Sequence, residues 1–287
     1  MRRRAFIFLL MKRPIVLVHG LWVTPHCWDK FRSYYESRGH QVLTPAWPGV
    51  RDDAPGMRRD ASSLNGVGAE EVVAHHVEII KALPEPPIIM GHSYGGVITQ
   101  VLIDRGLGAA GVAIDSVPPK GVYILPLSTY LALLPAFLKP STFKGTFLFT
   151  LGQFWKVFAN TLSEAEVREA YESIAIPASG RAIFQAALAN FMGNAPTFID
   201  FHNGKRAPLL LIGGEKDVIM PSALNRKNFH KYRSNAVTEF KEFPGRSHFI
   251  IAEKGWEEVA EHALSWAEAK ADEAGKPSPM NEPQPQN

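Results

Sequence analysis

The sequence predicts an α/β fold: a doubly wound, mainly parallel sheet of about six core strands, with a helical cap inserted after the fourth. Three observations predict it. Short apolar runs alternate with segments of helical periodicity through residues 14–118, and the same alternation returns over residues 207–272. Between them, residues 119–206 are rich in Leu, Phe and Ala and contain no clear strand pattern. Alternating strands and helices favour a parallel sheet with right-handed crossovers.

Each core element has a local signal. Strands are expected at residues 14–19, 41–46, 87–90, 111–115, 208–212 and 237–243, and the first of these is a continuous apolar run rich in β-branched residues. Helices are expected at residues 28–38, 69–83, 97–105, 221–232 and 255–271. The first of these ends at Gly39, in the position that favours glycine after a helix. Residues 48–68, rich in Gly, Asp, Pro and Ser, are expected to form a loop.

The pattern divides the chain into a first core part (1–118), a helical cap (119–206), a second core part (207–272) and a tail (273–287). Within the cap, Ser163-Glu-Ala-Glu166 has the form of a capping box, and residues 179–191 should form another helix. Residues 121–138 carry no charge but include two prolines, and sheet segments flank them on both sides. We therefore predict a lid over an apolar pocket there, without stable membrane insertion. The tail holds four prolines and should be disordered.

Composition restricts the function. Of 287 residues, 46% are hydrophobic and 21% charged, and the net charge of +3 is dispersed along the chain, so the sequence offers no electrostatic case for nucleic acid. A single cysteine, Cys27, excludes an intrachain disulfide. The apolar run 5–11 is short and lacks a following cleavage site, which predicts a cytoplasmic protein. Either Met11 is the true start or residues 5–11 form a short edge strand. The sequence does not predict an oligomeric state.

The pentapeptide Gly91-His-Ser-Tyr-Gly95 lies between an expected strand and an expected helix. A nucleophile elbow needs this strand–turn–helix setting, with glycines two residues on either side of the serine so that strand and helix can approach closely. The pentapeptide alone is a common pattern, and its placement makes it informative. We predict that Ser93 is a catalytic nucleophile.

A serine hydroxyl needs a base, and the base needs an orienting carboxylate; in such sheets the chain order is Ser, acid, His. His248 follows the last expected strand, at the carboxyl edge of the sheet, whereas the other histidines lie on expected helices, in the insertion or before Ser93. Asp217, in the loop after the fifth strand, is the predicted acid. Asp115, at the end of the fourth strand, is its nearest rival, and Glu215 is a weaker one.

The oxyanion of an acyl-transfer intermediate requires two preorganised backbone N–H groups. The residue after the nucleophile, Tyr94, should supply one, and Leu21, after the strand that ends in His19-Gly20, should supply the other. Trp22, next to this loop, is expected to line the substrate pocket. No nucleotide-binding glycine motif is present and the histidines form no metal-binding pattern, so we predict neither cofactor nor metal.

Together, Val18-His19-Gly20, the Ser93 pentapeptide, the Asp217–Pro221 loop and Ser247-His248-Phe249 resemble the α/β-hydrolase superfamily over about residues 14–118 and 207–272. Residues 16–40 are similar to small esterases related to plant methylesterases and hydroxynitrile lyases. Haloalkane dehalogenases and epoxide hydrolases of this fold carry an aspartate where this chain has Ser93. The resemblance therefore implies a serine hydrolase.

The expected reaction is hydrolysis of carboxylic esters with apolar acyl or alcohol groups, through an acyl-enzyme. Two alternatives stay open. The same triad could serve a lyase, carbon–carbon hydrolase or perhydrolase, and a hydroxynitrile lyase would place a lysine at the pocket. The insertion offers four lysines for that position: Lys120, Lys139, Lys144 and Lys156. A non-enzymatic ligand receptor is the other alternative.

Overall fold

The computed structural model describes residues 12–123 and 126–274. Its main sheet has six strands in the order β2-β1-β3-β4-β7-β8, and every neighbouring pair is parallel. The strands are β1 (Lys12–Val18), β2 (His40–Leu43), β3 (Ile88–His92), β4 (Ala110–Ile114), β7 (Leu209–Gly214) and β8 (Thr238–Phe243). The predicted sheet of six core strands is confirmed.

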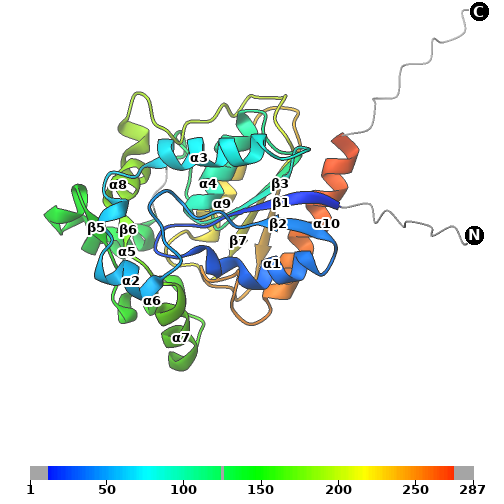
Figure 1. The fold of residues 1–287 in the computed structure, drawn as a ribbon. Helices are drawn as coiled ribbons and strands as arrows, with labels where there is room; N and C mark the ends of the chain where they lie inside the picture. The colour runs from blue at the N-terminus through cyan, green and yellow to red at the C-terminus, as the bar shows by residue number, and fades with distance from the viewer. Residues whose placement is uncertain (1–11, 124–125, 275–287) are drawn as a thin grey trace, which may run out of the picture.

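Helices cover both faces of this sheet, which is why its central strands are entirely buried and, apart from His92 at the end of β3, apolar. On one face lie α3 (Ala69–Lys81), α4 (Tyr94–Asp104) and α9 (Ser222–Phe229), and α4 packs on β3 and β4. On the other face lie α1 (Asp29–Glu36) and α10 (Trp256–Ala274), which contact each other (Figure 1). The ends of these strands and helices are therefore held in place by packing on both faces of the sheet.

Several core boundaries differ from the sequence prediction by about three residues, and α4 begins at Tyr94, before the predicted Val97. β2 ends at Leu43, before the predicted Ala46, and α10 continues to Ala274, beyond Ala271 and into the segment assigned to the tail. The predicted loop 48–68 contains α2 (Ala54–Arg59) and the 3₁₀ helix η2 (Ser62–Leu64). The side chain of Asp53 caps α2 by accepting a hydrogen bond from the Gly56 N–H at 2.9 Å. Such a short capped helix has too few turns to show apolar periodicity.

Between β4 and β7 the chain forms mostly helices, as expected. They are α5 (Leu127–Phe137), η3 (Pro140–Phe143), α6 (Leu151–Phe158), α7 (Glu164–Ile174), α8 (Gly180–Leu188) and η4 (Ala189–Phe191). The side chain of Ser163 caps α7 and Glu166 completes the predicted capping box. The expectation of no strand here is wrong, because β5 (Thr146–Phe147) pairs antiparallel with β6 (Ala178–Ser179). Two-residue strands joined across more than 30 residues leave no periodic signal.

In Figure 1 the elements of this insertion (green) gather at the end of the sheet where β1 finishes. A further short 3₁₀ helix, η1 (Pro25–Trp28), leads from that end into α1. Within residues 12–123 and 126–274, no helix has the length and apolar character needed to cross a bilayer. The predicted edge strand at 5–11 and most of the predicted disordered tail lie outside the described residues.

Candidate active site

Ser93 stands in the turn between β3 and α4 with φ +58° and ψ −119°. A positive φ is costly for a residue with a side chain, and it persists only where surrounding contacts hold it. Here the Ser93 N–H donates to the Ile114 carbonyl at 2.9 Å, and the Ser93 carbonyl accepts from the Gly96 and Val117 N–H groups at 3.0 Å each. The serine is 3% exposed. The backbone therefore has the strained turn that the pentapeptide predicts.

Glycines on both sides allow this turn. A Cβ at Gly91 would lie 2.0 Å from the Gly95 carbonyl oxygen, and one at Gly95 would lie 2.0 Å from the Val18 carbonyl oxygen. A third glycine, Gly20 in the loop after β1, approaches the nucleophile itself, because its Cβ would lie 2.8 Å from the Ser93 Cβ. Strand β1, the turn and α4 thus meet at distances that only glycine permits.

His248 and Asp217 are brought together from loops 31 residues apart. The Nδ1–H of His248 donates to Oδ2 of Asp217 at 2.6 Å, and both side chains are completely buried. Oδ1 of Asp217 accepts from the Ile219 and Met220 N–H groups at 2.9 and 2.8 Å. Three donors therefore fix this carboxylate, and the carboxylate fixes the histidine tautomer that leaves Nε2 free to accept a proton.

Nε2 of His248 is buried and has no hydrogen-bond partner among the described residues. No hydrogen bond joins it to Ser93 in that part of the chain. Unliganded active sites often hold such pairs apart, and the bond tightens when substrate arrives. The structure thus places Ser93 on the elbow and pairs Asp217 with His248. The two other candidates for the acid have different hydrogen-bond partners. Asp115 accepts from the Gly214 N–H at 2.6 Å, and Glu215 accepts from the Gly245 N–H on the surface.

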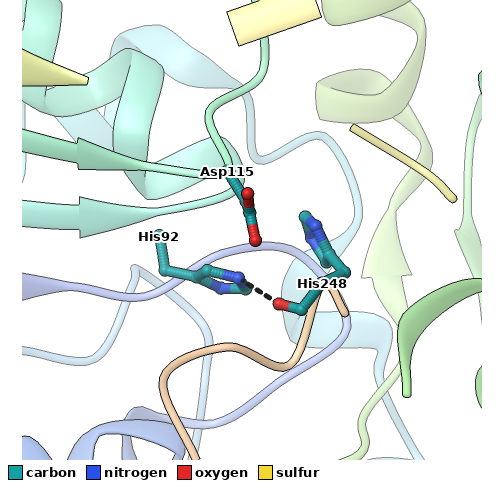
Figure 2. Close-up of side chains that lie close together, drawn as sticks. All are labelled: His92, Asp115 and His248. Carbon is teal, nitrogen blue, oxygen red and sulfur yellow. Dashed lines mark hydrogen bonds between the residues drawn. The ribbon is translucent and has the colours of Figure 1, made fainter. Parts of the chain in front are cut away.

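His92 is a site residue that the sequence reasoning missed, although it lies inside the pentapeptide. Its Nε2–H donates to the His248 carbonyl at 2.7 Å, and the two rings lie 4.6 Å apart between centroids (Figure 2). Burial, and then the neighbouring His248, lower the pKa of His92 well below its usual value. His92 is therefore a neutral donor that holds the backbone of the His248 loop.

Glu253 holds the same loop from the other side and was also missed. Its buried carboxylate accepts from the Ser247 N–H at 3.0 Å, from the Ser247 hydroxyl at 2.8 Å and from the Thr161 hydroxyl of the insertion. The contact to Thr161 links residues 92 positions apart, so no local pattern could have revealed it.

The two predicted oxyanion donors belong to two different segments that meet at Ser93. Tyr94 is the first residue of α4, and Leu21 follows Gly20 in the loop after β1. Among the backbone hydrogen bonds of residues 12–123 and 126–274, none starts at the N–H of either residue. His19 holds this loop: its Nδ1–H donates to the Gly20 carbonyl at 2.9 Å, and its Nε2 accepts from the Trp47 N–H at 3.1 Å. Burial lowers the pKa of His19 to about 3, so it is neutral.

Trp22, predicted to line the pocket, joins this loop to the insertion. It has φ +67°, and its Nε1–H donates to the Phe147 carbonyl at 3.0 Å. Its own carbonyl accepts from the Ile176 N–H at 3.0 Å, and its ring packs on Phe149 with centroids 4.6 Å apart. Val23 continues the contact by a bridge to Ala175. The loop proposed to hold the oxyanion and the insertion thus form one hydrogen-bonded unit.

Two cavities lie near this unit. The first, of about 10 Å³, is lined by Gly20, Leu21 and Trp22 together with residues 176–179, and it holds no more than a water molecule. The second, of about 1040 Å³, opens between the start of α1, α7 and the start of α10. None of Ser93, Asp217 and His248 lines it, although Phe249 does. Ser93, Asp217 and His248 are all buried in this conformation.

Three side chains of the described part could together hold a cation: His92, Asp115 and His248 each offer an atom within 4.8 Å of the others (Figure 2). One of them is the predicted catalytic base, whose Nδ1 is already bonded to Asp217. A cation bound there would compete with the triad for His248. The sequence predicted no metal, and that stays a prediction.

Comparison with known proteins agrees with this geometry. A family model described as the alpha/beta hydrolase family matches residues 15–262. Curated relatives include Methylesterase 8 of Arabidopsis thaliana, 28% identical over 33% of this chain and 34% of that protein. A carbendazim hydrolyzing esterase of Nocardioides sp. (strain SG-4G) is 35% identical over 31% of this chain and 35% of that protein. The chain thus aligns with about a third of the length of these two relatives.

Solved structures resemble the chain over most of its length. A monoacylglycerol lipase of Paleococcus ferrophilus has a TM-score of 0.63 and 22% identity, covering 91% of this chain and 97% of its own. Polyneuridine aldehyde esterase has a TM-score of 0.62 and 16% identity, covering 89% of this chain and 99% of its own. At these identities the likeness concerns the fold.

Proposed function

The chain belongs to the alpha/beta hydrolase family, and on that premise we propose that it is a serine-dependent hydrolase of carboxylic esters. The observation that carries the proposal is the fully buried His248–Asp217 hydrogen bond, formed at the same edge of the sheet as the strained Ser93 turn. A carboxylate-oriented imidazole next to a strained serine is the arrangement that acyl transfer requires.

The reaction proceeds in two halves. Oγ of Ser93 attacks the acyl carbon while Nε2 of His248 takes the hydroxyl proton, and the Leu21 and Tyr94 N–H groups bind the oxyanion. The intermediate collapses as His248 gives its proton to the departing alcohol, which leaves an acyl-serine. His248 then deprotonates a water that attacks the acyl carbon, and the acid departs as the proton returns to Ser93.

Apolar rings around the catalytic groups support a substrate with apolar acyl or alcohol groups. Phe158 of α6 packs on the His248 ring with centroids 4.6 Å apart, and Phe149 packs on Trp22. Because the cavity beside the oxyanion loop is only about 10 Å³, the substrate enters after residues 119–206 move as a cap.

The lyase alternative is weakened by the positions of the insertion lysines. Nζ of Lys120 donates to the carbonyls of Met192 and Gly193, and Lys139, Lys144 and Lys156 are exposed. None of the four lines the cavity beside Trp22. None of these four lysines is therefore placed at the cavity as the pocket lysine of a cyanohydrin lyase would be.

The test is hydrolysis of a p-nitrophenyl ester series, from acetate to long-chain acyl groups, by the wild type and by Ser93→Ala. We expect wild-type turnover on one or more chain lengths and loss of that turnover in Ser93→Ala, with an unchanged unfolding temperature. Full activity in Ser93→Ala would refute the mechanism. Absence of turnover on every ester, with Ser93 still labelled by a fluorophosphonate, would favour a lyase, carbon–carbon hydrolase or perhydrolase; ligand binding unaffected by Ser93→Ala would favour a receptor.

A further inference from the structure

Asp115 is a buried carboxyl group that the proposed mechanism does not use. It follows β4 directly and has φ +43°, a left-handed conformation that a side chain seldom adopts. Its N–H donates to the Ile212 carbonyl at 2.9 Å, and its Oδ1 accepts from the Gly214 N–H at 2.6 Å. The backbone of β7 therefore holds this side chain in place, and the strain indicates that the placement has a purpose.

The second oxygen of Asp115 points into the site. Oδ2 is buried, and within the described residues no N–H or O–H group donates to it. Asp217 lies close enough for the two carboxyl groups to share a hydrogen bond if one of them carries a proton. His92 and His248 each have an atom within 4.8 Å of an Asp115 oxygen (Figure 2). Asp115 thus lies beside both histidines of the site as well as near Asp217.

Two carboxyl groups in contact inside a closed site do not both ionise. Burial, and then the charge of Asp217, raise the pKa of Asp115 well above its usual value; the Gly214 N–H opposes this shift, and Glu253 adds to it. The donors are also unequal. Asp217 accepts from two backbone N–H groups and from His248, whereas Asp115 accepts from Gly214 alone. Of the two groups, Asp115 is therefore the one that retains a proton.

We propose that Asp115 carries a proton on Oδ2, donates it in a hydrogen bond to the Asp217 carboxylate, and so acts as a positioning residue for the His248–Asp217 pair. The inference rests on the proposed serine mechanism and extends it. The pair of carboxyl groups then holds one negative charge, and both oxygens of Asp115 have partners. Asp217 cannot rotate away from His248 without losing this fourth donor.

The experiment measures the second-order rate of Ser93 labelling by a fluorophosphonate against pH, which requires no ester turnover. Asp115→Asn keeps an acceptor for the Gly214 N–H and a neutral donor for Asp217. We expect its labelling rate to stay within about threefold of wild type, and the acid limb of its pH profile not to move. Asp115→Ala leaves the Gly214 N–H and one Asp217 oxygen without partners; the lost donor to Asp217 alone, at about 1–3 kcal/mol, should lower the rate about 5- to 150-fold.

Three results overturn the proposal. If the acid limb of Asp115→Asn moves down by about one pH unit, Asp115 carries a charge in the wild type, because removing a nearby negative charge makes imidazolium easier to deprotonate. If Asp115→Ala labels like the wild type while folding normally, Asp115 positions nothing. If EDTA slows labelling of the wild type but not of Asp115→Asn, Asp115 is a metal ligand together with His92 and His248.

Failure of the proposed serine mechanism and failure of the inference about Asp115 give different results. A wild type that no fluorophosphonate labels at any pH removes the proposed serine mechanism and this inference with it. A wild type that is labelled at Ser93, with an altered acid limb in Asp115→Asn, removes only the inference about Asp115. Thermal unfolding of each variant shows whether a lost rate reflects lost folding.

Discussion

The Nδ1 atom of His248 lies 2.6 Å from Oδ2 of Asp217, and neither side chain is accessible to solvent. A charge-assisted hydrogen bond that is closed to water is strong and strictly oriented. It fixes which ring nitrogen of His248 faces the substrate side of the site.

Asp217→Asn should lower kcat about 10⁴-fold, because the amide no longer holds the tautomer of His248 that accepts the Ser93 proton. Steady-state kinetics on the best p-nitrophenyl ester measure this. Glu215→Gln is the matched control, since Glu215 lies in the same loop but is exposed and bonds only to Gly245 and Lys216. Its kcat should stay within about twofold of wild type. An Asp217→Asn enzyme that keeps a tenth of the wild-type kcat would assign the triad carboxylate to another residue.

Gly20→Ala should lower kcat about 100-fold, because the new Cβ would lie 2.8 Å from the Ser93 Cβ and 3.0 Å from the His92 carbonyl oxygen. The displaced loop would carry Leu21 away from the oxyanion. Gly152→Ala in α6 is the control: no atom lies within 4 Å of its Cβ, so it should leave kcat unchanged and add about 0.5–1 kcal/mol of stability. Normal kcat in Gly20→Ala would mean that the loop after β1 is not held against the nucleophile.

Trp22→Phe should lower kcat about tenfold while retaining the ring contact with Phe149. The change removes the Nε1–H that donates to the Phe147 carbonyl, and a buried carbonyl without its donor costs about 1–3 kcal/mol. Because the Trp22 carbonyl also accepts from Ile176, hydrogen exchange of the Ile176 amide should become faster.

Trp155→Phe provides the comparison, since its Nε1–H donates to Leu162 inside the insertion and does not reach the loop after β1. That variant should keep wild-type kcat. Equal kcat in the two variants would show that the insertion does not hold the oxyanion loop.

His76 should make the protein sensitive to acid. Burial lowers its pKa to about 4, and its Nδ1–H donates to the Val72 carbonyl at 2.8 Å. The unfolded chain takes up this proton near pH 6.5, before the folded protein does, so stability falls as the pH drops from about 6.5 toward 4. Between pH 7 and pH 5 this one histidine should account for about 2 kcal/mol of lost unfolding free energy.

Urea unfolding of the wild type and of His76→Leu at pH 7 and pH 5 measures this contribution. The difference between the two pH values should shrink by about 2 kcal/mol in the variant. The curves of the two proteins should run parallel between pH 7 and pH 8, where His76 is neutral in both states. An undiminished pH dependence in His76→Leu would place the acid sensitivity in other groups.

The core of the fold was predictable because its signals are local. Apolar runs occupy most of β1 and β3, β3 ends inside the Gly91–Gly95 pentapeptide, and α7 begins at a capping box. The insertion was predictable only as helical, because the pairing of β5 with β6 and the bond from Trp22 to Phe147 join residues far apart in the chain.

The chain order of the candidate site residues was predictable, whereas the contacts that hold them in place were not. The sequence predicts Ser93, Asp217 and His248 because each comes after an expected strand. They also occur in the order serine, acid, histidine. His92 lies inside the motif, but its bond to the His248 carbonyl depends on how two loops 156 residues apart fold together. The sequence could offer Asp115 only as a rival to Asp217, because whether two carboxyl groups compete or share a proton depends on their contact in space.

The most direct test of the account is to locate the covalent intermediate. Wild-type protein is mixed with p-nitrophenyl butyrate, quenched in acid during turnover, digested and analysed by peptide mass spectrometry. The account predicts a butyryl group on Ser93 in the Gly91–Gly95 peptide, formed at a rate that matches turnover. Ester turnover with no acyl group on Ser93, or with the acyl group on another residue, would contradict it.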